Sequence, residues 1–307
     1  MSDMKNKADT SIRVCNFGSI NVDHVYAVDH FVRPGETLNS TSYRMFAGGK
    51  GYNQSVALAR SGVRVWHAGR IGDDHAWLID HMQHCGVDTS GIKRSQTPTG
   101  HAVIQVVPSG ENAIFLNGGA NLEITPAAAE EVITRFSPGD YLLIQNEISS
   151  ISEIIALGHS RNMTVVFNPA PMDETVLSYP LDLVDIFIVN AIEGEQLSQQ
   201  KKPQDIIACM KNMFPRAATV LTLGENGAIY ADSRQFIREA AYRVSPVDTT
   251  AAGDTFIGFF LGSLMQGKPF RNALARASKA AALCITRPGA ADSIPSLEEV
   301  KTACLEK

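Results

Sequence analysis

Residues 247–256 read Val-Asp-Thr-Thr-Ala-Ala-Gly-Asp-Thr-Phe, and an apolar run over 257–265 follows directly. A helix that begins here leaves its first N–H groups unpaired and turns its positive dipole end outward, which suits an anion. The carboxylate of Asp254 stands at the junction, where it can accept a proton from an attacking hydroxyl. Three residues have almost no side chain, so a ligand can approach their backbone: Ala251, Ala252 and Gly253. The stretch therefore predicts a helix start that binds an anion beside a general base.

Taken alone, Gly253-Asp254 is most simply a helix N-cap, because Asp is a favoured cap residue and glycine often precedes a helix. The whole run is more specific, since it resembles the Asp-Thr-x-Ala-Gly-Asp signature of the ribokinase family, the PfkB-type carbohydrate kinases. Gly49 and Asn53 match a second signature of that family, Gly-Gly-x-x-x-Asn. The glycine-rich loop at 47–54 that contains them is not a P-loop, and the GxGxxG fingerprint of a dinucleotide-binding dehydrogenase is absent. The resemblance implies a sugar kinase.

The composition of the 307-residue chain is that of an ordinary globular protein, with 44% hydrophobic and 19% charged residues. A net charge of −5 without a long Lys/Arg cluster argues against a nucleic-acid surface. The five cysteines are scattered and form no CxxC pair, which favours reduced thiols and a cytoplasmic protein. No apolar run is long enough to span a membrane, and 1–11 lacks the apolar core of a signal peptide. We expect 1–11 to be a loose tail.

Strands and helices alternate along most of the chain, which predicts an α/β fold with a mainly parallel central sheet and helices on both faces. The expected strands are 12–18, 64–71, 141–145, 164–168, 186–189 and 219–223. The expected helices include 126–136, 150–160, 191–198 and 203–214. We expect 12–300 to form a single domain of this kind.

Two β-rich runs, 101–107 and 113–116, flank a five-residue loop with Gly110 and predict a hairpin. From the residues alone, an edge hairpin of the central sheet is the simpler interpretation. The family resemblance instead implies a small β-sheet that lies over the site as a lid. Its segments would be approximately 22–48 and 98–120, and in the family such a lid often forms a homodimer surface.

Polar residues close several predicted strands at the edge where open α/β sheets bind ligands. Asn21 and Asp23 lie two residues apart, so in an extended chain their side chains point the same way and can bind neighbouring hydroxyls of a polyol. A turn after a strand explains the same pair equally well. Other strand ends carry Glu147, Asn190 and Thr222, each of which alone fits a cap or a loop. Together they indicate a ligand crevice.

The resemblance implies roles for individual residues. Asp254 would be the catalytic base, and the N–H groups of Ala251, Ala252 and Gly253 would stabilise the transferred phosphoryl group. Besides Asp254, the positions that match sugar-binding residues are Asn21, Asp23, Gly49, Lys50, Asn53 and Glu147. The positions that match nucleotide-binding residues are Asn190, Thr222, Gly224, Gly227 and Ser278.

The resemblance also implies metal ions beside ATP. Asn190 and Glu193 match the family's Asn-x-x-Glu, in which the glutamate organises the Mg²⁺ shell mostly through water. A monovalent cation, K⁺, would lie next to the anion site on oxygens of Asp248, Thr250, Cys284, Arg287, Gly289 and Ser293. Pro288 stands where many relatives carry lysine, and it removes an N–H group and stiffens the loop.

Within the family, the match is closest to the ribokinase subgroup. It rests on Gly-Ser-Ile-Asn-x-Asp at 18–23, Gly-Gly-Lys-Gly-x-Asn-Gln at 48–54 and Asn-Pro-Ala-Pro at 168–171. It implies the reaction of D-ribose and ATP to D-ribose 5-phosphate and ADP. Tyr52 and His101 lie near the expected sugar pocket, where a side chain can change the choice of sugar, so fructose, deoxyribose, a nucleoside and pseudouridine remain open as substrates.

Two other functions are weaker interpretations. A kinase for a phosphosugar needs a basic cluster, and only Lys50, Arg44 and Arg33 are candidates near the expected site. A non-catalytic sugar or nucleotide sensor on the same fold would be expected to lose the catalytic aspartate or the glycine beside it. Both Gly253 and Asp254 are present.

Overall fold

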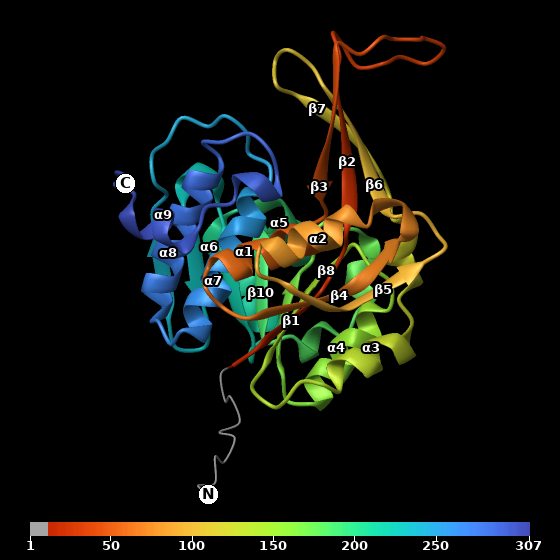
Figure 1. Ribbon diagram of the computed structural model, residues 1–307. Coiled ribbons are helices and arrows are strands. Elements are labelled where there is room, and N and C mark those ends of the chain that lie inside the picture. Colours follow the sequence, from red (N-terminus) through yellow and green to blue (C-terminus); the bar gives the residue numbers. More distant parts are fainter. Residues whose placement is uncertain (1–11) are drawn as a thin grey trace, which may run out of the picture.

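The computed structural model describes residues 12–307, so the tail expected at 1–11 lies outside the described residues (Figure 1). Its largest element is a nine-stranded sheet. From one edge to the other, the strands are β13 (Phe236–Glu239), β12 (Ala228–Ala231), β11 (Ala218–Thr222), β10 (Ile186–Asn190), β9 (Thr164–Asn168), β8 (Tyr141–Gln145), β1 (Val14–Phe17), β4 (Val65–Gly72) and β5 (Asp88–Ser95). Neighbouring strands are parallel from β11 to β5, and only β12 and β13 add antiparallel pairs.

The interior strands are almost entirely apolar because both faces of the sheet are covered. For example, β8 reads Tyr-Leu-Leu-Ile-Gln and β10 reads Ile-Phe-Ile-Val-Asn. Successive side chains point to opposite faces, so Leu143 and Val166 join one hydrophobic cluster and Leu142 and Val165 join the other. The mainly parallel sheet between two helical layers confirms the expected α/β fold class.

Helices cover both faces of this sheet (Figure 1). The first hydrophobic cluster contains side chains of α1 (Lys50–Arg60), α2 (Trp77–His84), α7 (Ala252–Met265), α8 (Phe270–Cys284) and α9 (Leu297–Thr302). The second contains side chains of α3 (Pro126–Ile133), α4 (Ile151–Ser160), α5 (Ala191–Ser198) and α6 (Pro203–Met213). Within residues 12–307, no helix is both long and apolar enough to cross a membrane.

A second, smaller sheet stands apart from the first (Figure 1). Its strands are, in order, β3 (Ser42–Gly48), β2 (Asn21–Ala27), β6 (Gly100–Val106) and β7 (Asn112–Asn117). β2 is antiparallel to β3 and parallel to β6, which in turn is antiparallel to β7. The expected hairpin is therefore β6–β7. It belongs to this separate sheet, so the simpler interpretation of an edge hairpin on the central sheet is wrong.

Helices α1 and α7 pack closely because a small residue lies at their contact. A Cβ on Gly258 would lie 2.7 Å from the carbonyl carbon of Ala57 and 2.7 Å from the amide nitrogen of Leu58. Such distances are too short for real atoms, so the helices approach this closely only because residue 258 is glycine. α1 begins at Lys50 and α7 at Ala252. The packing thus brings together two sequence motifs that lie about 200 residues apart.

Candidate active site

A cavity of about 1070 Å³ lies between the starts of α1 and α7 and one face of the small sheet. Alternate residues of the small sheet, such as Val25 and Ile104, form its outer wall. The cavity brings together many of the residues expected from the sequence, namely Asn21, Asp23, Gly49, Lys50, Asn53, Glu147, Asp248, Thr250, Ala251, Asp254 and Gly289. Signature motifs, strand ends and the small sheet therefore contribute to one space.

Asp254 lies in the first turn of α7 and lines this cavity. Its Oδ1 accepts a hydrogen bond from Nε2 of Gln54 at 2.9 Å, and its Oδ2 accepts one from Nδ2 of Asn53 at 3.1 Å. Burial raises the pKa of Asp254, while the charge of Lys50 and the two amides oppose the rise. The carboxylate is thus more basic than that of an exposed aspartate and is held in one orientation.

Two further carboxylates face the same space. Burial, together with the charges of Glu147 and Asp254, raises the pKa of Asp23 to about 7. Glu147 accepts hydrogen bonds from the backbone N–H of Lys50, at 2.9 Å, and from the hydroxyl of Ser19. Burial raises the pKa of Glu147 as well. The cavity therefore presents several oxygen acceptors to a ligand that carries hydroxyl donors.

Lys50 supplies the positive charge among these carboxylates. Although burial disfavours the charged form, the carboxylates of Asp254, Glu147, Glu193 and Asp23 raise the pKa of Lys50. The lysine therefore stays charged and partly neutralises the group.

The amide oxygen of Asn53 is a buried acceptor that lacks a donor. Nδ2 of Asn53 is engaged with Asp254, but Oδ1 has no hydrogen-bond partner among the described residues. Buried polar atoms are normally paired, because an unpaired one loses its hydration without compensation. A ligand hydroxyl beside Asp254 would supply the missing donor.

The start of α7 has a special backbone conformation. Ala251 adopts φ 59° and ψ 9°, in the left-handed region that residues other than glycine rarely occupy. A Cβ on Gly253 would meet no atom within 4 Å, so open space lies beside this residue. Of the three N–H groups expected to bind an anion, that of Ala252 donates to the carbonyl of Thr249 at 3.3 Å. The turn therefore shares one of the expected donors with its own backbone.

Asn190 and Glu193 lie outside the cavity lining, at the junction of β10 and α5, where they form a capping box. Oδ1 of Asn190 accepts from the N–H of Glu193 at 2.9 Å, and Oε2 of Glu193 accepts from the N–H of Asn190 at 2.9 Å. Burial raises the pKa of Glu193, and its charge in turn acts on Lys50. The pair thus caps a helix, and the charge of Glu193 also acts on a lysine that lines the cavity.

The other residues expected at a nucleotide also lie outside the cavity lining. Thr222 is the last residue of β11, and Gly224 and Gly227 follow it with φ of 56° and 88°. A Cβ on Gly224 would meet no atom within 4 Å, whereas one on Gly227 would lie 2.9 Å from the backbone nitrogen of Ala241. Gly227 is therefore needed by the turn itself, and Gly224 borders open space.

Ser278 is buried in α8, away from the cavity lining. Among residues 12–307, no side-chain hydrogen bond joins Ser278 to another residue of the expected site.

The residues expected at a monovalent cation cluster around Asp248. The carboxylate of Asp248 accepts N–H groups of Thr250 at 2.9 Å and Gly289 at 3.0 Å. Although burial acts in the opposite direction, these hydrogen bonds hold the pKa of Asp248 below its usual value. The Cys284 thiol lies 3.7 Å from the carbonyl oxygen of Thr250 and 3.1 Å from the hydroxyl of Ser293. The N–H of Arg287 closes the loop by donating to the Cys284 carbonyl at 3.2 Å.

Two residues that the sequence places near the pocket point elsewhere. Tyr52 is fully buried, and its hydroxyl contacts Nδ1 of His81 rather than the cavity. In β6, Ala102 lines the cavity, so the neighbouring His101 faces the other side of the small sheet, where its ring lies 5.9 Å from that of His24. The expectation that Tyr52 and His101 adjust the pocket directly is therefore wrong.

The structure adds residues to which the sequence analysis gave no role. Gln54, which follows Asn53 in the glycine-rich motif, holds Asp254. Asn121 donates from Nδ2 to Oδ1 of Asn21 at 2.7 Å and fixes that side chain at the cavity wall. The position of Gln54 inside the motif was the one available signal.

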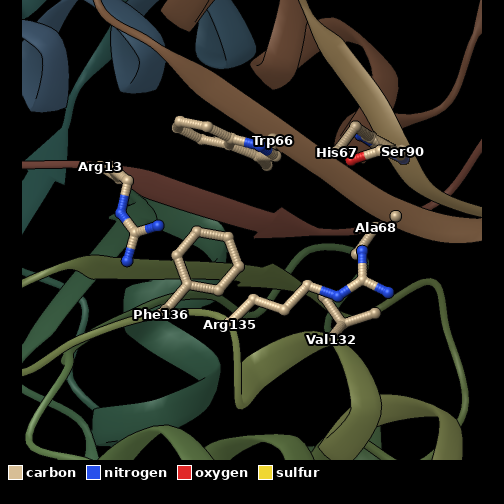
Figure 2. A pocket seen from close by; sticks show the side chains of 9 residues that line it. Arg13, Trp66, His67, Ala68, Ser90, Val132, Arg135 and Phe136 are labelled. Carbon is tan, nitrogen blue, oxygen red and sulfur yellow. The ribbon is translucent and has the colours of Figure 1, made fainter. Parts of the chain in front are cut away.

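A second cavity is too small to hold a sugar. Figure 2 shows it between Arg13, Trp66, Phe136 and Arg135, and its volume is about 50 Å³. A water molecule occupies about 30 Å³ in the liquid, so the space suits one or two waters. Arg13 is already paired with Asp140 at 2.6 Å. The large cavity is therefore the candidate site.

Comparisons with known proteins identify the family of the chain. A family model described as "pfkB family carbohydrate kinase" matches residues 11–297. The ribokinase of Haemophilus influenzae is 35% identical over 291 residues, which are 92% of this chain and 95% of that protein. The ribokinase of Cryptococcus neoformans var. grubii, solved with ADP, has a TM-score of 0.83 and 32% identity over 95% of this chain and 99% of that one. The Arabidopsis thaliana ribokinase, complexed with ribose and ATP, has a TM-score of 0.84 and 28% identity over 95% of this chain and 97% of that one.

Proposed function

The chain belongs to the pfkB family of carbohydrate kinases and is a sugar kinase, and from that premise we propose that it transfers a phosphoryl group from ATP to a hydroxyl of D-ribose. The observation that carries the proposal is the position of Asp254, which lies at the start of α7 and faces a cavity rich in hydroxyl acceptors. The similar ribokinases, one of them complexed with ribose and ATP, support the choice of substrates.

In this proposal, Asp254 accepts the proton of the attacking hydroxyl. Its raised pKa suits that role, because a stronger base takes up a proton more readily as the oxygen attacks phosphorus. The orphaned Oδ1 of Asn53 accepts another hydroxyl of the same sugar. The remaining sugar contacts come from Asn21, Asp23, Gly49, Lys50 and Glu147. Phosphoryl transfer depends mainly on such positioning and on charge stabilisation.

The helix start of α7 receives the transferred phosphoryl group. Its backbone N–H groups at 251–253 and the positive end of the helix dipole stabilise the charge that develops there. The open space beside Gly253 is what a phosphoryl group needs to approach the backbone closely. The nucleotide itself would lie along the ends of β10 and β11, on Asn190, Thr222, Gly224, Gly227 and Ser278.

The residues present fit two metal ions. Each carboxylate oxygen of Glu193 accepts one N–H donor and keeps a lone pair for a water of hydrated Mg²⁺. When bound, Mg²⁺ would neutralise charge on the nucleotide phosphates. Among residues 12–307, no three His, Cys, Asp or Glu side chains are placed to ligate a metal directly. Binding of Mg²⁺ through water molecules does not require such a cluster. Carbonyl and hydroxyl oxygens around Asp248 suit K⁺, to which Cys284, Arg287 and Gly289 would contribute carbonyls and Thr250 and Ser293 further oxygens.

The small sheet acts in this proposal as a lid over the sugar, within one kinase domain over 12–300. One of its faces lines the cavity, and its closure would exclude water and suppress hydrolysis of ATP. The opposite face exposes large apolar side chains, including Tyr43, Met45 and Phe115, and we propose that it forms a homodimer interface.

The proposal is tested by a coupled assay of ADP release with Mg-ATP over pentoses, hexoses, their monophosphates and nucleosides, with and without K⁺. Turnover highest with D-ribose is the expected result, and stimulation by K⁺ would support the cation site despite Pro288. A higher kcat/KM for fructose, deoxyribose or a nucleoside would contradict ribose specificity and retain the mechanism. Preference for a sugar monophosphate would favour a phosphosugar kinase. Of the basic candidates for such a substrate, Lys50 and Arg44 line the cavity and Arg33 does not.

A further inference from the structure

Gln54 is a fully buried residue of α1, and it directly follows Asn53, which lines the cavity. It is not among the cavity-lining residues, and the proposed mechanism gives it no role. Its amide nevertheless contacts the carboxylate of Asp254. A buried amide with four hydrogen-bonding sites is costly unless most of them are paired, so its partners define what it does.

The orientation of this amide is fixed by the ends of two adjacent strands. Oε1 of Gln54 accepts from Nε2 of Gln145, the last residue of β8, at 2.6 Å. Nε2 of Gln54 donates to Oδ1 of Asn168, the last residue of β9, at 3.2 Å. Gln145 is itself anchored to Oδ1 of Asn16 in β1 at 2.9 Å. Because oxygen meets a donor and nitrogen meets an acceptor, a flipped amide would lose both bonds.

With its orientation fixed, the amide has one remaining N–H, and this points at the reacting carboxylate. Nε2 of Gln54 donates to Oδ1 of Asp254 at 2.9 Å, and Asn53 donates to Oδ2 at 3.1 Å. The inference rests on the role of Asp254 in the proposed function. We propose that Gln54 is a positioning residue which, anchored by Gln145 and Asn168, holds the Asp254 carboxylate ionised and aimed into the cavity.

The charges around Asp254 explain why such a donor is needed. The negative charge of Asp254 interacts unfavourably with those of Asp23, Glu147 and Glu193. It also disfavours the thiolate form of Cys284 in α8. Burial acts in the same direction, whereas the charge of Lys50 and the two amides favour the ionised form. Without Gln54, Asp254 would hold its proton to higher pH and could not act as a base there.

The experiment compares Gln54→Glu and Gln54→Met with the wild type in the full-length protein. Glutamate has the shape of glutamine but brings a second carboxyl group to Asp254, so the two must share a proton. Methionine keeps the volume and removes the donor. We expect the acid limb of kcat/KM for D-ribose to move up by about one pH unit in Gln54→Glu and by less in Gln54→Met. The Kd for ATP should remain unchanged in both variants.

The matched control is Gln266→Glu. Gln266 is also an amide that bridges two elements, since it donates to the carbonyl of Ser61 at 2.9 Å and accepts from Arg276 at 2.8 Å. It has no contact with Asp254, so its substitution should leave the pH profile in place even where it changes stability. Thermal melts identify variants that fail to fold, and if Gln54→Glu fails, Gln54→Met provides the comparison.

A second measurement is independent of turnover. In protein labelled with ¹³C at the aspartate carboxyl, the resonance of Asp254 is assigned by its loss in Asp254→Asn, and its pKa is titrated directly. A higher pKa in Gln54→Met than in the wild type supports the inference even if D-ribose is not the substrate. Equal pKa values, or an unmoved acid limb in an active and folded Gln54→Glu, would overturn it while leaving the proposed function intact.

Discussion

Gly253 separates the requirements of the fold from those of the proposed reaction. A Cβ at this position would meet no protein atom within 4 Å, and the residue lies in the first turn of α7. Alanine is the better helix former, so Gly253→Ala should leave stability unchanged or raise it by up to about 1 kcal/mol. The new methyl group would occupy the space proposed for the phosphoryl group, so kcat should fall by roughly tenfold or more.

Urea unfolding and steady-state kinetics on the same preparation of Gly253→Ala check this expectation. Unchanged kcat with unchanged stability would show that no ligand approaches Gly253. Gly224 offers a matched position, because its Cβ would also enter open space, on the side of the proposed nucleotide. Its φ of 56° adds backbone strain for alanine, so only the kinetic comparison is informative there.

Asp23 should make the ligand-free protein less stable as the pH rises. Its pKa is raised to about 7 in the folded state, whereas an unfolded aspartate titrates near 3.8. The folded state therefore binds the proton more tightly, and this contribution to stability is lost as the pH rises toward 7. Asparagine mimics the neutral form at every pH. Relative to the wild type, the free energy of unfolding of Asp23→Asn should therefore rise by about 2 kcal/mol as the pH increases from 5 to 8.

Denaturant titrations of both proteins at pH 5 and pH 8 measure this difference. The comparison with the wild type cancels the opposite effect of His67, whose pKa burial lowers to about 3 and which favours folding as the pH rises. A difference between Asp23→Asn and wild type that does not change with pH would mean that Asp23 is ionised throughout.

The sequence motifs predicted which residues belong to the site better than they predicted where individual side chains point. Asp254 and Asn53, one from each signature motif, are joined by a hydrogen bond. Tyr52 lies between Lys50 and Asn53 in the sequence but points to His81. Side chains two positions apart on a helix, such as those of Lys50 and Tyr52, point in directions that differ by about 200°. His101 faces away from the cavity for the equivalent reason in a strand. Which side chains of a helix or strand face the cavity depends on where the element begins and on what it packs against. A single sequence does not fix either of these.

At the scale of elements, the contact between α1 and α7 should control the site. Gly258→Ala would push a methyl group against the backbone of Ala57 and Leu58. Overpacking of this kind should destabilise the protein by about 1–3 kcal/mol. It should also lower kcat, because α7 carries Asp254 and α1 carries its partners Asn53 and Gln54. Urea unfolding gives the first value and the ADP-release assay gives the second.

A matched control for the element contact is Gly139→Ala. Gly139 lies in a turn with φ 88°, and a Cβ there would meet no atom within 4 Å, so this substitution lowers stability through the backbone alone. If both variants lose stability and both keep full kcat, the α1–α7 contact does not position the carboxylate.

The central strands could be predicted from the sequence, whereas the edge strands could not. β8, β9 and β10 are runs of apolar residues that only a covered parallel sheet requires. β5 reads Asp-Thr-Ser-Gly-Ile-Lys-Arg-Ser, and β13 is a four-residue edge strand. Such edges carry polar residues because one side of the strand meets solvent, so their pattern resembles that of a loop. The small sheet is built on the pairing of β2 with β6, which lie far apart in the sequence. The residue pattern alone therefore could not show that this sheet is separate.

At the scale of the whole molecule, we expect a homodimer formed through the small sheet. Phe115 is 61% exposed on the face of this sheet away from the cavity, next to Ile114 and Leu116, which line the cavity. Phe115→Glu would bury a charge in the proposed interface, so it should convert a dimer to a monomer. Light scattering at working concentration measures the mass.

Leu177→Glu is the control, because Leu177 is 56% exposed but lies outside the small sheet. A monomeric wild-type protein would contradict the dimer, and a Phe115→Glu variant that remains dimeric would place the interface elsewhere.

The most direct test of the central claim is the turnover of D-ribose and Mg-ATP by the wild type and by Asp254→Asn. The account predicts that the wild type produces D-ribose 5-phosphate and that kcat in Asp254→Asn falls by roughly three orders of magnitude. The Kd for ATP, measured by calorimetry, should change less than about twofold, because Asp254 acts on the sugar hydroxyl rather than on the nucleotide. Near-normal turnover by Asp254→Asn would contradict the account.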